Sequence, residues 1–146
     1  MHLRRLVAVF LCFIMFISFG GQVHAIPNSN LETFQRGKIS PFMVYIVDAG
    51  ATLSISSTGK AVIDSYLLGD SRAVTKIEIK TELQYYINGR WTTRNTWTSS
   101  SNNNYTTIDE STQLSKGYLY RALSTVTAYS GSASETQTVI SREVRY

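Results

Sequence analysis

The sequence predicts an all-β protein with one antiparallel sandwich domain, and two observations carry this prediction. Residues 76–99 alternate apolar and polar side chains around an Asn-Gly pair, which is the pattern of a β-hairpin. From residue 51 onward, short alternating segments are separated by turn residues at regular intervals. No window has the periodicity of an amphipathic helix, and no internal repeat is present. We therefore expect about seven strands in a single domain.

The first 25 residues have the features of a secretory signal peptide. Arg4 and Arg5 precede an apolar run over Leu6–Phe19, and Ala25 is a small residue at the expected cleavage position. The apolar run is shorter than the roughly 20 residues that a membrane-spanning helix needs. We expect cleavage after Ala25 and export of a secreted protein with no membrane attachment. Retention of the segment as an anchor is the alternative.

Cleavage would change the chemical inventory of the chain. The single Cys12 and both histidines, His2 and His24, lie in the signal peptide. A mature chain without them has no Ser-His-Asp or Cys-His nucleophile, no zinc site built on these residues and no disulfide. The absence of a disulfide from an exported protein favours a Gram-positive bacterial origin over an animal ectodomain. Of the 14 basic residues, Arg4 and Arg5 would also be removed, leaving 12 against 10 acidic residues.

The remaining elements follow in order along the chain. Residues 26–44 have no periodicity and are expected to form a flexible leader before a domain over residues 45–146. Strands are predicted over Ala51–Ser56, Ala61–Leu68, the two arms of the 76–99 hairpin, Tyr105–Asp109, Lys116–Tyr129 and Glu135–Arg142. Gly, Ser, Asn and Asp residues occupy the connections, as turns require.

The register of the central hairpin decides where its two tryptophans point. A two-residue Asn88-Gly89 turn would place Trp91 opposite Tyr86, on the charged face of the hairpin. A three-residue turn with Gly89 as a left-handed bulge would place Trp91 opposite Tyr85 and Trp97 opposite Ile79, and would bury both tryptophans. Burial of two indoles is worth several kcal/mol at roughly 25 cal/mol per Å². We therefore predict the bulged register.

The segment from Leu114 to Ala122 resembles the E–F corner of fibronectin type III and immunoglobulin-like domains. Leu114, a turn containing Gly117, and Tyr120 have the spacing of a tyrosine corner, whose hydroxyl bonds back to the turn backbone. The Tyr85, Gly89 and Trp91 pattern is similar to the C–C′ hairpin of fibronectin-type modules. This resemblance implies an immunoglobulin-like (fibronectin type III-like) antiparallel β-sandwich. The usual tryptophan near the second strand is missing, which leaves the strand order open.

The arrangement of signal peptide, leader and single sandwich also resembles that of small uncharacterised secreted proteins of Gram-positive bacteria. This second resemblance implies location and fold, and it implies no activity.

Candidate catalytic motifs in the chain have simpler structural explanations. Ser57-Thr58-Gly59-Lys60 matches the Ser-x-x-Lys string of penicillin-binding enzymes, but it lies in a predicted turn without the companion motifs. Glu78 and Glu82 lie four strand residues apart and alternate with lysines, which favours a solvated charged face. Asp48, Asp64 and Asp70 are too dispersed for a calcium loop. We expect no enzymatic activity, no cofactor and no metal.

Aromatic residues are the remaining candidates for recognition. In the bulged register the exposed rings would be Tyr86, Tyr105 and Tyr129, which are the predicted ligand contacts. Basic residues interleave with acidic ones, so no nucleic-acid partner is expected. The sequence predicts a secreted, non-enzymatic module with a recognition or structural role towards an unidentified protein partner. The alternative is a carbohydrate-binding or cell-wall-binding module that uses exposed aromatics.

Overall fold

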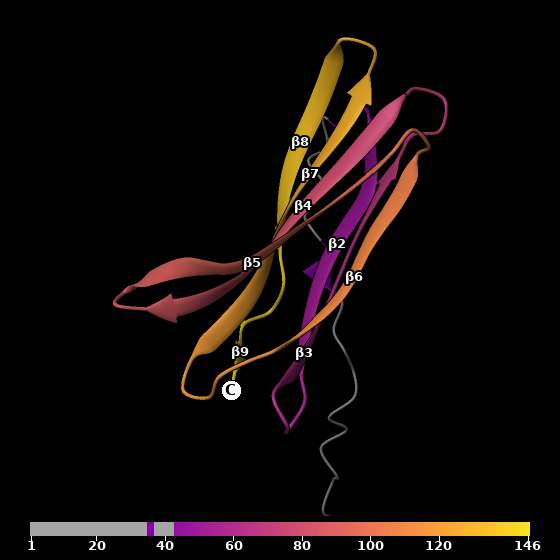
Figure 1. Ribbon diagram of the computed structural model, residues 1–146. Coiled ribbons are helices and arrows are strands. Elements are labelled where there is room, and N and C mark those ends of the chain that lie inside the picture. The colour runs from indigo at the N-terminus through magenta and orange to yellow at the C-terminus, as the bar shows by residue number, and fades with distance from the viewer. Residues whose placement is uncertain (1–34, 37–42) are drawn as a thin grey trace, which may run out of the picture.

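The computed structural model describes residues 35–36 and 43–146, which form two antiparallel sheets packed face to face (Figure 1). The predicted signal peptide and most of the predicted leader lie outside the described residues. Within that leader, β1 (Gln35–Arg36) pairs antiparallel with Gly50 and Ala51, so this short piece adds to the edge of a sheet.

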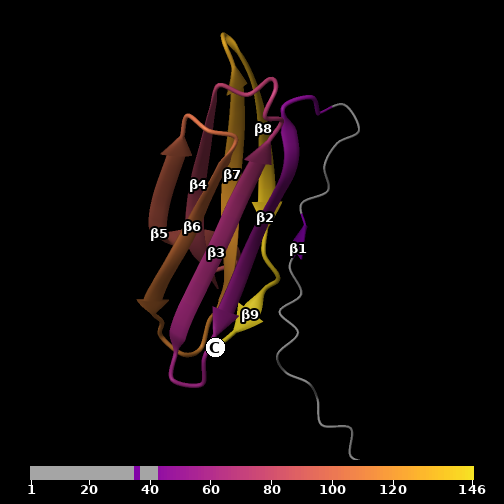
Figure 2. The same cartoon turned by 90° about the vertical axis from the view of Figure 1, so that its right-hand side faces the viewer.

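The strands divide into two sheets according to their pairing. The first sheet has the order β1-β2-β3-β6 and contains β2 (Ile46–Ile55), β3 (Lys60–Gly69) and β6 (Tyr105–Gln113). The second sheet has the order β5-β4-β7-β8, built from β4 (Lys76–Ile87), β5 (Arg90–Ser101), β7 (Leu119–Ser130) and β8 (Ala133–Ile140). A short β9 (Val144–Arg145) also pairs with β7. Figure 2 shows the first sheet in front of the second.

The all-β sandwich that the sequence predicts is therefore confirmed in its coarse form. The seven long strands, β2 to β8, correspond to the seven that were expected, and β1 and β9 add two residues each. β2 starts earlier than predicted, at Ile46, because the preceding apolar run continues directly into this strand.

Alternation along each strand builds the core between the sheets. Inward-facing residues of β3 and β4, such as Ile63, Leu67, Ile77 and Leu83, are fully buried, while the residues between them face outward. The buried apolar residues form two clusters, one around Leu67, Ile77 and Ile79 and the other around Ile63, Leu83 and Tyr120.

Three buried hydroxyl groups lie at inward positions in the middle strands of the sandwich. Ser65 of β3, Thr81 of β4 and Ser124 of β7 are at most 2% exposed. The Thr81 Oγ1 donates to Ser65 Oγ at 3.0 Å, and Ser124 Oγ lies 2.8 Å from each of the other two oxygens. The three oxygens thus form a closed ring in which each hydroxyl can donate once and accept once. This ring satisfies three buried polar groups and joins the two sheets.

The predicted tyrosine corner hydrogen bond is present. The Tyr120 hydroxyl donates to the Ser115 carbonyl at 2.9 Å, and the Tyr120 side chain is fully buried. Burial raises the pKa of the Tyr120 phenol above its usual value, so the hydroxyl stays a hydrogen-bond donor. Leu114 is buried in the same cluster, and Gly117 has the positive φ (99°) that the intervening turn requires.

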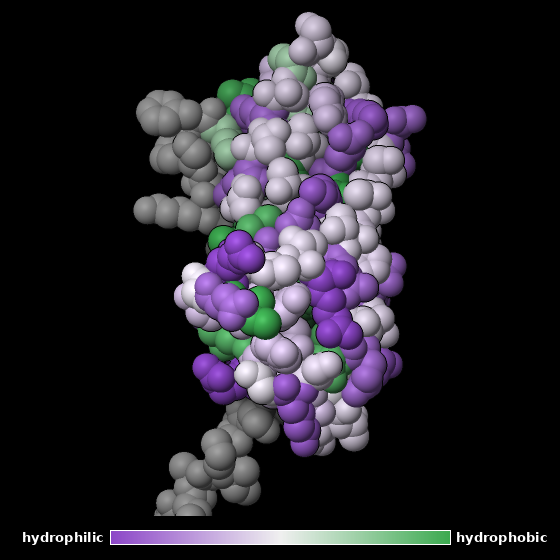
Figure 3. Space-filling model, turned by 60° about the vertical axis from the view of Figure 1, so that its left-hand side comes forward, coloured by the Kyte–Doolittle hydropathy of each residue, from purple (hydrophilic) through white to green (hydrophobic). Residues whose placement is uncertain are grey.

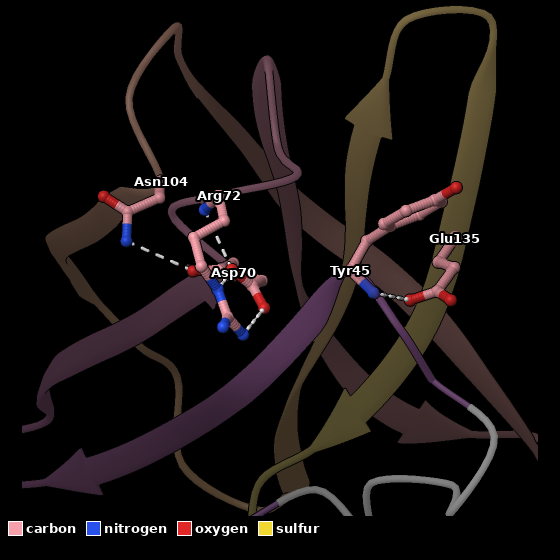
Figure 4. Close-up of polar contacts among 6 residues, drawn as sticks. Tyr45, Asp70, Arg72, Asn104 and Glu135 are labelled. Atoms are coloured by element: carbon pink, nitrogen blue, oxygen red, sulfur yellow. Dashed lines mark hydrogen bonds and ion pairs between the residues drawn. The ribbon is translucent and has the colours of Figure 1, made fainter.

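At the opposite end of the sandwich, a carboxylate fixes the start of β2 (Figure 4). Glu135 of β8 accepts backbone N–H groups from Val44, Tyr45 and Ile46 at 2.6, 2.7 and 3.1 Å. Burial raises the pKa of the Glu135 carboxyl, but the three backbone donors together outweigh burial and hold this pKa below its usual value. Glu135 therefore links the two sheets at this end.

The loop between β3 and β4 is closed by a local ion pair, also drawn in Figure 4. Arg72 donates its backbone N–H and its guanidinium to Asp70, which lowers the pKa of the Asp70 carboxyl to about 2. The neighbouring Asn104 side chain donates to the Gly69 carbonyl at 3.1 Å and ties the β5–β6 connection to this loop.

Candidate functional site

The β4–β5 turn differs from the predicted one, and this difference creates the candidate site. Ile87 pairs with Arg90 and Tyr86 pairs with Trp91, so the connection is the two-residue Asn88-Gly89 turn. Both turn residues have positive φ, 53° and 77°, as a type I′ hairpin turn requires. The predicted three-residue bulged turn is wrong. Trp91 consequently shares a face with Tyr86 instead of entering the core.

A bulge further along the hairpin restores the other tryptophan to the inner face. The register shifts by one residue because Leu83 pairs with Asn95 while Gln84 pairs with Thr93, which leaves Arg94 as the extra residue. Beyond this point Trp97 pairs with Thr81 and packs against both apolar clusters. The prediction that Trp97 faces inward is therefore confirmed, although its partner is Thr81 and not Ile79.

Two aromatic rings and a guanidinium meet on the outer face of the second sheet, and we call Tyr86, Trp91 and Arg121 the aromatic cluster. The Tyr86 and Trp91 rings lie edge to face, with centroids 5.3 Å apart and planes 62° apart. The Arg121 guanidinium carbon, from β7, lies 4.1 Å from the centroid of the Trp91 ring. Tyr86 is 43% exposed and Trp91 is partly exposed, so both remain accessible at this end of the hairpin.

Hydrogen bonds hold the cluster in place along β4. Arg121 Nε donates to the Gln84 amide oxygen at 2.9 Å, and the Gln84 amide nitrogen donates to Glu82 at 3.0 Å. Glu82 also accepts from Thr93 at 2.9 Å and from Lys80 at 2.7 Å. The Lys80 ammonium, together with Thr93 and Gln84, lowers the pKa of the Glu82 carboxyl. Gln84 is only 8% exposed although it lies on an outer face, which shows how closely this network is packed.

The structure separates the three tyrosines that the sequence predicts as ligand contacts. Tyr129 lies on the same outer face as Tyr86 but near the opposite end of β4, where it donates to Glu78 at 2.8 Å. Lys76 lies 5.5 Å from the Tyr129 ring centroid and 2.6 Å from Glu78. The hydrogen bond to Glu78 raises the pKa of the Tyr129 phenol. Its hydroxyl is thus engaged within the sheet.

Tyr105 lies on the outer face of the other sheet and does not meet Tyr86 or Tyr129. It is 52% exposed and borders a small hollow of about 210 Å³. The hollow is lined by Asp64, Ser65, Tyr66, Tyr105, Thr107, Ile108 and Asp109. Asp64 pairs directly with Asp109 across β3 and β6, so two carboxylates border the hollow.

The Ser57–Lys60 string connects β2 to β3, in agreement with the predicted turn. In this connection the Gly59 N–H donates to the Ser56 carbonyl at 2.9 Å. Among residues 35–36 and 43–146, no group of three or more His, Cys, Asp or Glu side chains is placed to hold a metal ion. In the same ranges, no helix is long and apolar enough to cross a membrane.

Sequence reasoning missed Trp91, Arg121 and Gln84 as members of a surface site. The Asn88-Gly89 pair was the signal that could have found Trp91, because this dipeptide strongly favours a two-residue turn. Arg121 comes from a strand 30 residues further along the chain than Trp91, and its position depends on the β4–β7 pairing. Comparisons of the chain with protein-family models, curated proteins and solved structures found no match.

Proposed function

We propose that this chain is a secreted, non-enzymatic recognition module that binds a cell-wall glycan through the outer face of its second sheet. The observation that carries the proposal is the position of Trp91 beside Tyr86 on this face. The signal-peptide pattern of the first 25 residues supports export to the place where such a ligand occurs.

The chemistry of the aromatic cluster favours carbohydrate over other ligands. Sugars present flat C–H faces beside hydroxyl groups, so they need apolar rings and hydrogen-bonding groups at the same place. Here the Trp91 ring lies beside Tyr86 and beneath the Arg121 guanidinium, which is hydrogen-bonded to Gln84, and Gln84 is in turn hydrogen-bonded to Glu82. The rings are fixed before any ligand arrives, which reduces the entropy cost of binding. Trp, Tyr and Arg are also the residue types most enriched at binding hot spots.

Besides Tyr86, the exposed large hydrophobic residue on the outer face of this sheet is Ile140 of β8, which lies opposite Leu123 of β7. Figure 3 shows this side of the molecule as mainly hydrophilic or neutral, with hydrophobic residues in small separate groups. A stable protein interface has a more apolar central core than this, so the surface fits a hydroxylated ligand better than a protein partner.

The fold that we propose for this module is fibronectin type III-like. Its seven long strands divide into β2, β3 and β6 in one sheet and β5, β4, β7 and β8 in the other. This division and the tyrosine corner in β7 support the assignment. Domains of this architecture commonly act as binding scaffolds, but the ligand is argued here from the site alone.

Binding of the purified protein to insoluble cell wall and to soluble glycans tests the proposal. Trp91→Ala and Tyr86→Ala should each weaken glycan binding at least tenfold, the loss expected at an aromatic hot spot worth about 2 kcal/mol. Tyr105→Ala, on the other sheet, is the matched control and should bind normally. Unchanged binding by both cluster variants, or retention of a protein partner in place of glycan, would refute the proposal.

A further inference from the structure

A second feature of the same outer face is a polar hollow of about 400 Å³ over the middle of β4. We call it the β4 hollow, and it lies between β5 on one side and β7 on the other. Its lining is formed by Glu78, Ile79, Lys80, Thr98, Ser99, Ser100, Thr125 and Thr127. This volume lies within the range of small-molecule binding sites, about 300–1,000 Å³.

The β4 hollow lies between two ion pairs formed by the charged side chains of β4. Lys76, Glu78, Lys80 and Glu82 alternate in sign along the outer face, so Glu78 and Lys80 are neighbours on it. The ion pairs, however, join Lys76 to Glu78 and Lys80 to Glu82. The two inner side chains are therefore each directed to the partner on their far side. The space between them is left to the short side chains of the flanking strands.

The walls of the β4 hollow are rich in hydroxyl groups arranged by the strand register. Lys80 lies opposite Thr98 on one side and Thr125 on the other. Glu78 lies opposite Ser100 and Thr127 in the same way. Each row thus presents one charged group between two hydroxyls, offering both donors and acceptors. Because each charge is compensated by its own ion pair, the lining favours a neutral, polyhydroxylated ligand over an ionic one.

The β4 hollow and the aromatic cluster lie on the same face of one strand. Lys80 and Tyr86 are six positions apart on β4, which corresponds to about 20 Å at 3.3 Å per strand residue. Between them lie Glu82, which is partly exposed and accepts from Lys80, and Gln84, which is 8% exposed and holds Arg121 in place. A single sugar ring is too short to touch both.

We propose that the β4 hollow binds further sugar units of one linear, uncharged glycan whose other end stacks on the aromatic cluster. This inference rests on the proposed function and adds the ligand class: an extended oligosaccharide running along β4. The Tyr86 and Trp91 rings supply apolar contact at one end of the glycan. The Ser and Thr hydroxyls of the β4 hollow fix the position of the sugar units at the other end.

The test is the dependence of affinity on oligosaccharide length. Wild-type protein is titrated calorimetrically with chitin and glucan oligosaccharides, from the disaccharide to the hexasaccharide, and with solubilised glycan strands. We expect affinity to rise with length. The double variant Thr98→Val and Thr125→Val should lower hexasaccharide affinity about tenfold, which corresponds to roughly 1.4 kcal/mol, and leave the disaccharide unaffected. Thr107→Val, an exposed threonine on β6 of the other sheet, is the matched control and should leave both affinities unchanged.

The outcomes separate this inference from the proposed function. Equal affinity for short and long oligomers, or hexasaccharide binding unchanged in the double variant, would overturn the inference, whereas a loss of affinity in Trp91→Ala would still support the proposed function. No binding of wild type to any of the three probes would overturn the proposed function and the inference together. Ser100→Ala removes another wall hydroxyl and serves as the second variant if the double variant fails to fold.

Discussion

The buried hydroxyl ring makes a quantitative prediction about non-additive stability. Thr81→Val removes the hydroxyl that bonds to both Ser65 and Ser124, and it changes the side-chain volume very little. The remaining serines can share one hydrogen bond, so one buried donor loses its partner. Two lost bonds at about 1 kcal/mol each predict a destabilisation of about 2 kcal/mol.

Replacing the whole ring should cost less than the separate replacements suggest. The triple variant Ser65→Ala, Thr81→Val and Ser124→Ala leaves no buried hydroxyl without a partner in the ring. Its cost should stay near or below that of Thr81→Val alone, far under the sum of the three single variants.

Urea unfolding at neutral pH measures both quantities. With a slope of about 2 kcal/mol/M, Thr81→Val should lower the unfolding midpoint by about 1 M. Additive losses in the triple variant, or a midpoint for Thr81→Val within error of the wild type, would refute the account of the ring.

Two further predictions concern the ends of the sandwich. Tyr120→Phe should destabilise the protein by about 1 kcal/mol, because the part-buried hydrogen bond from the Tyr120 hydroxyl to the Ser115 carbonyl is lost. Tyr118→Phe serves as the control and should change the stability little; equal effects of the two variants in urea unfolding would contradict a specific corner bond. The pKa of Glu135 is lower in the folded state than in the unfolded state, where it is near 4.5. The ionised Glu135 carboxylate therefore stabilises the folded protein fully above pH 4.5, and this stabilisation is lost as the pH falls through the pKa of the folded state. Glu135→Gln should therefore unfold more easily than wild type at pH 7, with the difference shrinking below pH 4.5; a difference that is constant with pH would contradict this role.

Much of the fold could be predicted because its signals are local. Apolar and polar side chains alternate from Ile77 to Leu83, which predicts the face of β4 that points inward. The residues on that face are buried in the structure: Ile77, Ile79, Thr81 and Leu83. The spacing of Leu114 and Tyr120 predicts a bond within one turn, and that bond is present. Such signals need no knowledge of which strands are neighbours.

The candidate site could not be predicted in full, for two physical reasons. In a hairpin with one register throughout, Trp91 and Trp97 lie on the same face, so burying one requires burying the other. The bulge at Arg94 separates the two tryptophans and satisfies both the Asn88-Gly89 turn and the core. Contacts such as Arg121 on Trp91 and Glu135 on Tyr45 join distant parts of the chain and depend on strand pairing.

The central claim is that Trp91 lies on the surface that binds glycan, and tryptophan fluorescence tests it most directly. A Trp97→Phe variant leaves Trp91 as the only tryptophan in the protein. The account predicts that acrylamide quenches its emission, and that a saturating cell-wall glycan shifts the emission and reduces the quenching. Blue-shifted emission that neither acrylamide nor glycan affects would place Trp91 in the core and contradict the account.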